Sequence, residues 1–519
     1  MSKYRLGIDV GGTNTDAVVL DNETLEVVAA VKTPTTLDPS EGVIASIDAV
    51  LSASGVEPSS IAFAMLGTTH ATNAIVERRG LGRVGVLRIA APATTAVPPL
   101  EGWPDALRRA VGNHAHIVSG GLEIDGRPIA DLDTGEIRTA CRAMRGEVDA
   151  VAVVGVFSPI DAFQEEAVAS IVVEELGVPV SQSAQLGSLG LLERENATVL
   201  NAALIETLRS MAEGLNAALR QRGIDARMYF GQNDGTLMAV DYALQFPVLT
   251  IGGGPTNSIR GAAHLSGLTD GLVVDIGGTT TDVGMLVQGF PRQSADAVTL
   301  GDVRTNFRMP DILSIGLGGG TIVRSHDSDT GNVVTVGPDS VGYRLTTEAR
   351  SFGGSTLTAT DIAIASGSAS IEGIRPVPLR SELVAAARAE ILEMLEDAVD
   401  RMKTSAAPVP VVLVGGGSII VDAPLAGVSN IVRPPHHGAA NAVGVALGDI
   451  AGEAEKLVAT GDARKRMREA AADEAIDRAV RAGADPASVE TTSIDELPVS
   501  YSAGESVRIR ARAVGRLRA

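Results

Sequence analysis

The stretch Asp9-Val10-Gly11-Gly12-Thr13-Asn14-Thr15-Asp16 recurs later in the chain as Asp275-Ile276-Gly277-Gly278-Thr279-Thr280-Thr281-Asp282. A short apolar run precedes each copy and another comes after it. No helical period continues from either copy, so the pattern predicts a strand, a glycine turn and a second strand, which together form a β-hairpin. A single Gly-Gly turn is commonly just a turn between strands. The same pattern in each half of the chain predicts a shared function.

The residue types in these hairpins suit a bound anion. Two glycines let the backbone come close to a phosphate and turn its N–H groups toward it, and Thr13 and Thr279 add hydroxyl donors. Asp9 and Asp275 would repel phosphate directly, but a carboxylate fits there if Mg²⁺ lies between, through water. We therefore predict two hairpins that close on the phosphates of one nucleotide.

Length and composition restrict the class of protein. A chain of 519 residues is too long for one core, so two or three domains are expected. The net charge of −20 and the lack of a basic block before the arginine-rich C-terminus argue against nucleic acid as a partner. Cys141 is the sole cysteine, which leaves no disulfide within the chain and suits a reducing cytoplasm. We expect no signal peptide and no membrane span.

The order of apolar runs and turns predicts three parts. Residues 1–190 form a first α/β domain with an irregular excursion over 91–135, and residues 191–454 form a second one. Residues 455–519 are expected to add a charged helix over 455–482 and a strand over 506–514. The alternation in that strand is typical of an edge strand with solvated arginines.

A polar run comes directly after a predicted buried strand over 61–66. It reads Gly67-Thr68-Thr69-His70-Ala71-Thr72-Asn73-Ala74 and leads into a helix. Open α/β sheets place ligands at the carboxyl ends of strands, so Thr68, Thr69, His70 and Asn73 are candidates for the substrate side. Alternatively, the threonines and Asn73 simply cap the helix.

Two later segments complete the candidate nucleotide site. A long helix is predicted over 192–221, and Glu193 and Glu195 in its first turn either favour the helix dipole or present a carboxylate to the nucleotide. A fully apolar strand over 411–414 ends in Gly415-Gly416-Gly417-Ser418. That turn exposes a surface without side chains, which suits the adenine and ribose.

These features together resemble the acetate kinase, sugar kinase, Hsp70 and actin superfamily, in which two ribonuclease-H-like domains close on ATP-Mg. Within it, the chain resembles the A-type subunit of the hydantoinase/oxoprolinase family. The motifs that carry the resemblance are Gly7–Thr13, Gly67–Ala74, Glu193-Arg194 with Thr198 and Asn201-Ala202, Val274–Asp282, Thr358–Asp361 and Val414–Ser418. The run from Gly67 to Ala74 is specific to this family. The resemblance implies an α/β fold of two actin-like ATPase domains facing across a nucleotide cleft, with a small C-terminal α+β extension.

The resemblance also implies an activity. Relatives open a cyclic amide or imide of the hydantoin, N-methylhydantoin or 5-oxoproline type at the expense of ATP, by phosphorylating the carbonyl oxygen, and some activate ketones for carboxylation. The A-type subunit phosphorylates and a B-type subunit completes hydrolysis. A cytoplasmic hetero-oligomer with a B-type partner is therefore expected.

Site residues can be carried over from the family motifs. Asp9 and Asp275 would position Mg²⁺ and count as catalytic, together with Glu193 and His70. The expected nucleotide contacts are Gly11, Gly12, Thr13, Asn14, Gly277, Gly278, Thr279, Thr280, Gly415, Gly416, Gly417 and Ser418. Phosphoryl transfer also needs a group that orients water or acts as base. The sequence leaves that role open among Asp16, Asp282, Glu193 and His70, and both Asp16 and Asp282 alternatively cap the hairpin turns.

Two departures from the family keep other functions open. Typical A-type subunits continue with a further domain, which here shrinks to a helix and a strand, and a usual Ser-Gly-Pro-Ala reads Gly253-Gly254-Pro255-Thr256. The alternative is an ATP-driven conformational machine or reactivating chaperone, whose slow ATP hydrolysis no small molecule would stimulate. The Gly67–Ala74 run favours an enzyme, and it counts with the scarcity of aromatics against a simple carbohydrate kinase.

Overall fold

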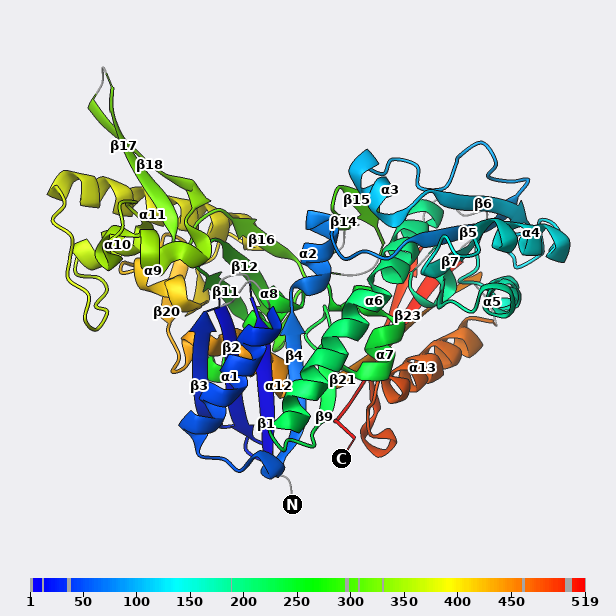
Figure 1. Cartoon of the computed structure of the whole chain (residues 1–519), viewed down its shortest axis with the longest axis horizontal. Helices are drawn as coiled ribbons and strands as arrows, with labels where there is room; N and C mark the ends of the chain where they lie inside the picture. Colours follow the sequence, from blue (N-terminus) through cyan, green and yellow to red (C-terminus); the bar gives the residue numbers. More distant parts are fainter. Residues whose placement is uncertain are drawn as a thin grey trace.

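Two large sheets, each containing one of the predicted hairpins, organise the chain (Figure 1). The computed structural model describes residues 3–11, 14–34, 39–187, 189–294, 298–306, 309–328, 331–459, 463–499 and 506–518. The predicted fold class is confirmed: the chain is α/β, with one domain built around each of the two hairpin-containing sheets. Within the described part of the chain, no helix is both long enough and apolar enough to cross a membrane.

The first sheet has the strand order β22-β23-β21-β10-β9-β4-β1-β2-β3. Six of its strands, which end at the edge strand β3, are β1 (Tyr4–Val10), β2 (Asn14–Asp21), β3 (Val27–Pro34), β4 (Ile61–Thr68), β9 (Arg227–Gly231) and β10 (Leu237–Ala239). Helices α1 (Pro39–Ser54) and α6 (Leu191–Gln221) cover one face, and α12 (Ala440–Leu447) covers the other. Val43, Ile47 and Val50 recur at helical spacing in α1 and are buried against Leu6 and Ile8 of β1. The hydrophobic period therefore positions α1 on the sheet.

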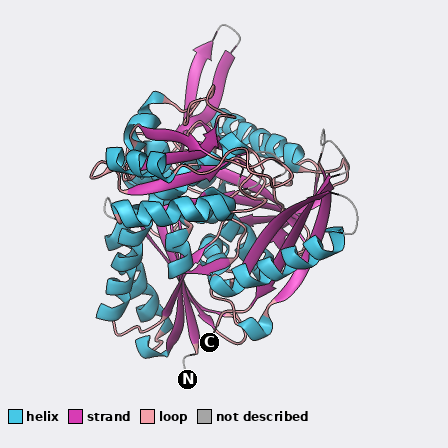
Figure 2. Cartoon of the chain, turned by 90° about the vertical axis from the view of Figure 1, so that its right-hand side faces the viewer, coloured by secondary structure: helices cyan, strands magenta, loops and turns pink. Residues whose placement is uncertain are grey.

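The second sheet repeats this plan. It contains β11 (Gly271–Ile276), β12 (Thr281–Val287), β13 (Phe290–Pro291), β16 (Ile312–Ile315), β19 (Val409–Val414) and β20 (Val428–Val432). Helices α10 (Ala359–Ala365) and α11 (Ser381–Met402) pack on one face, and α8 (Gly253–Ser266) packs on the other. A ribbon of β17 (Thr321–Ser328) and β18 (Gly331–Ser340) projects beyond this half (Figure 1 and Figure 2).

The chain crosses between the two sheets at α8 and at α12, and these helices pack directly on each other. A Cβ atom added to Gly261 would lie 1.9 Å from the carbonyl oxygen of Ala440, and one added to Gly444 would lie 1.8 Å from that of Asn257. Only glycine allows backbones to approach so closely. The two crossing helices therefore form a tight joint between the halves.

A separate four-stranded sheet is inserted between β4 and β9. Its strands β5 (Val84–Ala91), β6 (His114–Ser119), β7 (Ala150–Gly155) and β8 (Val180–Gln182) are all parallel, and α3 (Asp105–Val111), α4 (Thr134–Met144) and α5 (Phe163–Leu176) connect them. The insertion thus exceeds the expected excursion over 91–135, which itself holds α3 and β6. The reason is that β5 and β7 are buried on both faces and pair with each other, not with β4.

The C-terminal segment extends the first sheet, which differs from the expected separate extension. It consists of β21 (Ile450–Ala459), α13 (Ala463–Arg481), β22 (Glu490–Pro498) and β23 (Ser506–Gly515). The helix predicted over 455–482 therefore begins later, because residues up to 459 belong to β21.

The predicted edge strand is not an edge. β23 pairs with β21 on one side and with β22 on the other, so β22 is the edge strand at this end of the sheet. Ile509 and Ala511 are buried in a cluster with Ala475 of α13. On the other face, Arg512 lies 2.6 Å from a carboxylate oxygen of Asp234. The alternation thus reflects one packed face and one face of paired arginines.

Candidate active site

Both hairpins adopt the same register and place two aspartates directly opposite each other. Asp9 pairs with Asp16 across β1 and β2, and Asp275 pairs with Asp282 across β11 and β12. The turns also match. The N–H of Gly11 donates to the carbonyl of Asn14 at 3.0 Å, and the N–H of Gly277 donates to that of Thr280 at 2.9 Å. Gly12 and Thr13 lie outside the described residues. The repeated sequence therefore encodes a repeated backbone.

The four aspartates share a buried, mutually repulsive environment. Burial, and then the neighbouring Asp16, raise the pKa of Asp9 to about 7. Burial raises the pKa of Asp282 to about 6, and it also raises the pKa of Asp16 and of Asp275. Such carboxylates ionise together at neutral pH only when a positive charge lies among them. This donor chemistry fits a hard cation such as Mg²⁺.

Two asparagines from the crossing helices reach these acids. The side-chain N–H of Asn257 on α8 donates to Asp9 at 3.4 Å. The side-chain amide of Asn441 on α12 lies within hydrogen-bonding reach of both Asp9 and Asp275, which offsets a small part of the rise that burial causes in the pKa of each. Asn441 therefore lies between the two hairpins. The sequence motifs did not reveal it, although it is the only polar side chain in α12.

Lys32 is a second residue that the sequence motifs did not reveal. It lies opposite Asp16 on β3, with its Nζ 2.5 Å from one carboxylate oxygen and 2.7 Å from the other. A Cβ added to Gly416 would lie 3.8 Å from its Cε. Lys32 thus spans from the first hairpin to the glycine turn of the second half. The available signal was that it is the only charged residue in an otherwise uncharged strand over 27–33.

A bare glycine backbone packs against the first aspartate of each hairpin. Gly67 pairs with Asp9 in register, and a Cβ at Gly67 would lie 2.4 Å from its carboxylate. A Cβ at Gly415 would lie 2.2 Å from the carboxylate of Asp275. Gly415 has a φ of 84° and comes directly after β19, which runs parallel to β11. The two glycine-containing motifs therefore occupy equivalent places in the two halves.

The predicted adenosine turn lies directly against the second hairpin. A Cβ at Gly417 would lie 2.3 Å from the carbonyl oxygen of Gly277. Ser418 is buried and its N–H donates to the carbonyl of Gly415 at 3.2 Å. The structure thus brings Gly415, Gly416, Gly417 and Ser418 together with Asp275 and the predicted phosphate turn.

A loop that contains Gly319 and Gly320 packs against the turn of the second hairpin. The N–H groups of Gly319 and Gly320 donate to the carbonyls of Gly277 and Gly278 at 3.0 and 2.7 Å. Within the described chain, the N–H groups of Gly278 and Thr279 donate to no partner. The carbonyl groups of the turn are therefore bonded within the protein, whereas the N–H groups of Gly278 and Thr279 are available to bind an anion.

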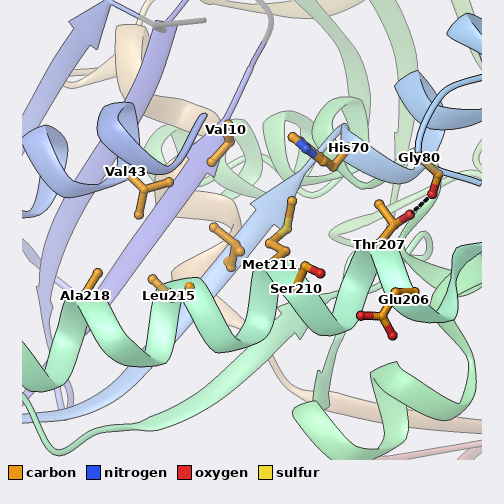
Figure 3. A pocket seen from close by; sticks show the side chains of 12 residues that line it. Val10, Val43, His70, Gly80, Glu206, Thr207, Ser210, Met211, Leu215 and Ala218 are labelled. Carbon is orange, nitrogen blue, oxygen red and sulfur yellow. Dashed lines mark hydrogen bonds between the residues drawn. The ribbon is translucent and has the colours of Figure 1, made fainter. Parts of the chain in front are cut away.

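The predicted substrate residues surround the start of α2 (His70–Glu77), beside the first hairpin. The hydroxyl of Thr69 donates to the carbonyl of Val10 at 3.4 Å and accepts from the amide of Asn73 at 3.4 Å. The N–H of His70 donates to the hydroxyl of Thr68 at 3.0 Å, which is a local contact of the capping kind. His70 is half-buried, and burial lowers its pKa. Its ring lines a cavity of about 440 Å³ (Figure 3).

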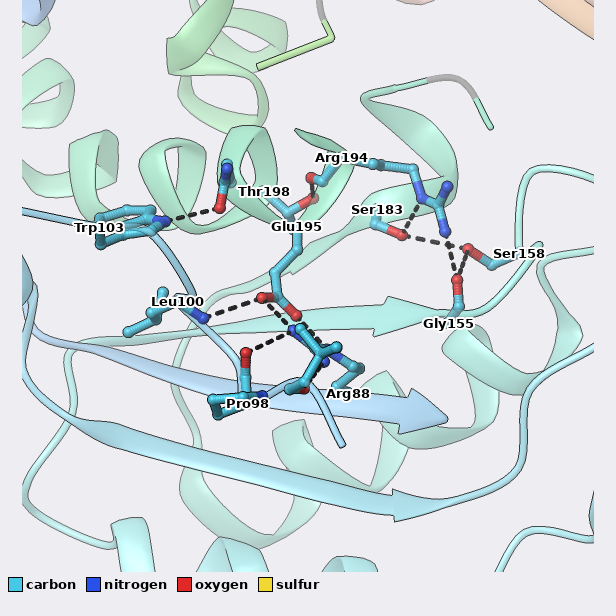
Figure 4. Close-up of polar contacts among 12 residues, drawn as sticks. Arg88, Pro98, Leu100, Trp103, Gly155, Ser158, Ser183, Arg194, Glu195 and Thr198 are labelled. Carbon is cyan, nitrogen blue, oxygen red and sulfur yellow. Dashed lines mark hydrogen bonds and ion pairs between the residues drawn. The ribbon is translucent and has the colours of Figure 1, made fainter. Parts of the chain in front are cut away.

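Glu193 lies apart from the hairpins, at the start of α6. It is 3.8 Å from Arg304 on β15 (Val303–Thr305) and makes no described contact with the four aspartates. The next glutamate, Glu195, is 1% exposed and accepts two hydrogen bonds from Arg88 of β5 at 2.6 and 2.7 Å (Figure 4). These contacts join α6 to the inserted sheet.

Arg194 makes a second buried contact to the insertion (Figure 4). Its Nε donates to the hydroxyl of Ser183 at 2.9 Å, and burial lowers its pKa to about 10. Glu165 accepts from the same Ser183 hydroxyl at 2.5 Å and from the N–H of Gly155 at 2.7 Å. The matching motif around Glu193 and Arg194 therefore has a structural part in this chain, because it anchors the insertion.

No ready-made metal cluster exists in the described ranges, since no three His, Cys, Asp or Glu side chains converge there. A cation at the hairpin aspartates would thus complete its shell with other oxygen atoms. Water and phosphate supply such oxygens for Mg²⁺.

Two family models cover most of the chain. Residues 5–176 match the N-terminal region of hydantoinase/oxoprolinase, and residues 194–372 match hydantoinase/oxoprolinase itself. The alpha subunit of caprolactamase from Pseudomonas jessenii is 28% identical over 403 residues, which are 71% of this chain and 55% of that subunit. The gamma subunit of acetophenone carboxylase from Aromatoleum aromaticum is 28% identical over 400 residues, 70% of this chain and 53% of that subunit. The chain thus spans about half the length of the curated relatives it matches.

Solved structures show the same fold. The ATP-dependent caprolactamase from Pseudomonas jessenii superposes with a TM-score of 0.79 at 19% identity, over 99% of this chain and 88% of that one. The nucleotide-free acetone carboxylase superposes with a TM-score of 0.67 at 19% identity, over 100% and 88% of the two chains. With its paired hairpins and both family regions in sequence, the chain belongs to the hydantoinase/oxoprolinase family.

Proposed function

We propose that this chain is the phosphorylating subunit of an ATP-dependent enzyme that opens a cyclic amide or imide. The observation that carries the proposal is the pair of hairpins in identical register, whose buried Asp9 and Asp275 both lie next to Asn441. The relatives support an enzyme over a conformational machine, because they are named as subunits of a caprolactamase and of two ketone carboxylases.

The hairpins would hold the nucleotide. Asp9 and Asp275 would hold Mg²⁺, which when bound would neutralise charge on the phosphates and on the aspartates themselves. The free N–H groups of Gly278 and Thr279 fit phosphate oxygens. We assign the remaining nucleotide contacts to Gly11, Gly12, Thr13, Asn14, Gly277, Thr280, Gly415, Gly416, Gly417 and Ser418.

The transferred group moves from ATP to the carbonyl oxygen of the substrate. The bond between the γ-phosphorus and the ADP oxygen breaks, and a bond from that phosphorus to the carbonyl oxygen forms. The amide nitrogen loses its proton to a base, and an imidate phosphate results. Water then attacks the activated carbon, and the ring C–N bond breaks as the nitrogen takes up a proton, which leaves an acyl phosphate. A second water hydrolyses this acyl phosphate to the free carboxylate and inorganic phosphate.

Chain residues would assist this transfer in two ways. Lys32 lies beside Asp16 and near Gly416, so its ammonium group is suited to stabilise negative charge on the transferred phosphoryl group. Asp16, Asp282 and His70 are the candidates for the base, with His70 on the substrate side together with Thr68, Thr69 and Asn73. We assign Glu193 no part in the reaction, because its described partner is Arg304.

We propose a B-type subunit as the partner and the cytoplasm, where ATP is made available, as the location. The proposal of a partner rests on the names of the relatives, which are subunits. Hydantoins, 5-oxoproline, lactams and ketones are the candidate substrates.

The test is ADP release with Mg²⁺ by the purified chain, alone and with candidate B-type subunits, against a panel of those compounds. We expect one cyclic amide to stimulate ADP release, and Asp9→Asn and Asp275→Asn each to reduce it by about 10²-fold or more. ATP turnover that no small molecule stimulates, even with the partner present, would refute the enzyme and favour the conformational machine.

A further inference from the structure

None of the described residues that line the cavity beside the first hairpin is among those assigned to the nucleotide. The cavity lies between α6 on one side and the ends of β1 and β4 on the other (Figure 3). Val10, one of its lining residues, comes directly after Asp9, but successive side chains of a strand point to opposite faces. Asp9 therefore faces α8 and α12, while Val10 faces the cavity. The cavity thus opens beside the acids at the carboxyl end of two parallel strands, where α/β sheets bind ligands.

The walls of the cavity are largely apolar. The apolar side chains belong to Val10, Val43, Leu66, Met211, Leu215 and Ala218. A few polar groups accompany them, namely His70, Glu206, Thr207 and Ser210. A volume of about 440 Å³ falls within the range of roughly 300–1,000 Å³ that is typical of small-molecule sites. An apolar wall with few polar groups suits a compact organic molecule.

The charge of the lining selects among cyclic amides. The described lining contains neither lysine nor arginine, burial lowers the pKa of His70, and the carboxylate of Glu206 is paired with Arg209 at 2.9 Å. A substrate that carries its own carboxylate, such as 5-oxoproline, would find no cation here and would face Glu206. A hydantoin would bring two carbonyls and two N–H groups to a wall with few partners, and unpaired polar groups cost binding free energy.

We propose that this cavity binds the hydrocarbon ring of an uncharged, methylene-rich lactam, whose amide group hydrogen-bonds to His70. This inference rests on the proposed function, because it names the substrate of the same site. Binding of the lactam can nevertheless be tested apart from the reaction, because burial of its methylene groups against Val10, Leu66 and Met211 supplies the affinity. His70 has both a donor and an acceptor nitrogen when neutral, and it would orient the amide toward the hairpin.

Gly214 offers a way to fill the cavity without harming the fold. It lines the cavity from the C-terminal third of α6, and a Cβ added there would meet no atom within 4 Å. Leucine is also a better helix former than glycine, so Gly214→Leu should fold. Asn216→Leu is the matched control, because residue 216 is exposed and turned about 200° around the helix from Gly214.

The experiment measures binding of ε-caprolactam, hydantoin and 5-oxoproline to the purified full chain by calorimetry, in the wild type and both variants. We expect the seven-membered lactam to bind at least about tenfold more tightly than 5-oxoproline, and Gly214→Leu to weaken lactam binding by about tenfold. Asn216→Leu should bind the lactam like the wild type, and Mg-ATP affinity should be the same in all three proteins.

The outcomes separate this inference from the proposed function. Lactam binding that Gly214→Leu does not weaken, or tighter binding of 5-oxoproline, overturns the assignment of the cavity. Lactam binding that Gly214→Leu abolishes, without lactam-stimulated ADP release in the complete complex, upholds the cavity and refutes the proposed reaction. Lactam-stimulated ADP release that is unchanged in Gly214→Leu upholds the reaction and refutes the cavity.

Discussion

The two halves of the chain share a hairpin in identical register, but different residues face the second aspartate of each hairpin. Lys32 on β3 lies opposite Asp16, whereas Ser314 on β16 lies opposite Asp282 and donates to it at 2.5 Å. The first half therefore carries a cation in the place where the second half carries a hydroxyl. Two hairpins with the same backbone can therefore surround equivalent aspartates with different charges.

The halves also differ in the segment that each places after the strand parallel to its hairpin. In the first half, β4 leads through α2 into the inserted sheet. In the second half, β19 leads into the glycine turn at Gly415 and on to β20. In the first half, His70 of α2 lines the cavity together with residues of α6, whereas the second half presents a bare backbone at the equivalent place. Substrate and adenosine are accordingly assigned to opposite halves.

The largest effect should come from detaching the insertion, which distinguishes the first half from the second. Glu195→Ala leaves the buried guanidinium of Arg88 without its partner, and we expect it to lower the free energy of unfolding by about 3–5 kcal/mol. Urea denaturation measures this. Glu193→Ala is the matched control, since its contact with Arg304 is 3.8 Å long and partly exposed, and it should cost less than about 1 kcal/mol.

The same comparison tests whether the halves bind nucleotide without a firmly anchored insertion. Mg-ATP affinity of Glu195→Ala should match the wild type at a temperature where the variant stays folded. If Glu195→Ala weakened Mg-ATP binding by as many kcal/mol as it lowers the free energy of unfolding, nucleotide binding would depend on the insertion and not on the hairpins alone.

The second prediction concerns the glycine beside each first aspartate. We expect Gly415→Ala to destabilise the protein by about 3 kcal/mol. Its Cβ would lie 2.3 Å from the carbonyl oxygen of Ile276, and its φ of 84° with ψ of 156° is a region reserved for glycine. At Gly67 the closest atoms belong to the side chains of Asp9 and Asn257, which can rotate away.

Gly67→Ala should therefore destabilise the fold by only about 1 kcal/mol. Because it displaces Asp9, its effect should appear in Mg-ATP affinity. Urea denaturation and calorimetry on both variants check the contrast. Equal losses of stability in the two variants would contradict the distinction between a glycine that contacts backbone and one that contacts only movable side chains.

The third prediction exchanges the residues that distinguish the hairpins. Lys32→Gln removes the cation beside Asp16, and we expect it to lower kcat/KM for ATP by about 10²-fold. Lys32→Arg keeps the charge and should restore much of the activity. Ser314→Ala removes a neutral hydrogen bond at the equivalent place and should change kcat/KM only a few-fold. Similar losses of kcat/KM in Lys32→Gln and Ser314→Ala would contradict the proposal that only the first hairpin needs a cation beside its second aspartate.

The sequence predicted the local features of this molecule well. The hairpin repeat determined both turns, and the 3.6-residue period located α6, predicted over 192–221 and observed at Leu191–Gln221. These features depend on residues close together in the chain. The family resemblance, carried by the same motifs, is confirmed by both family regions.

Features that depend on distant residues were missed. β21 joins β10 and β23, so residues near 450 pair with residues near 515, and no local pattern encodes which strand becomes an edge. Asn441 and Lys32 reach the acids only because α12 crosses from one sheet to the other and β3 pairs with β2. The motif at Glu193 was assigned to chemistry, although its neighbours Arg194 and Glu195 are buried anchors of a domain that the sequence did not reveal.

The smallest expected effect is on pH dependence, and it compares Asp9 with Asp282. Their pKa values of about 7 and about 6 mean that lowering the pH from 8 to 6 protonates mainly Asp9. Protons then compete with Mg²⁺, so Mg-ATP affinity should fall about tenfold over this interval through Asp9 and about twofold through Asp282. Calorimetry at pH 6, 7 and 8 should show that Asp282→Asn keeps most of the dependence, whereas Asp9→Asn loses it.

The stability of the chain without nucleotide should change with pH in the opposite direction from Mg-ATP affinity. Because the folded pKa of Asp9 lies above its unfolded value near 3.8, the folded state binds the extra proton. That contribution to stability is fully present below pH 4 and is lost as the pH rises through about 7. The Tm of the nucleotide-free wild type should therefore decrease between pH 6 and pH 8 relative to that of Asp9→Asn. A Tm difference between wild type and variant that does not change from pH 6 to pH 8 would mean that Asp9 is already charged in the folded state, and that Lys32 serves both hairpins and not the first alone.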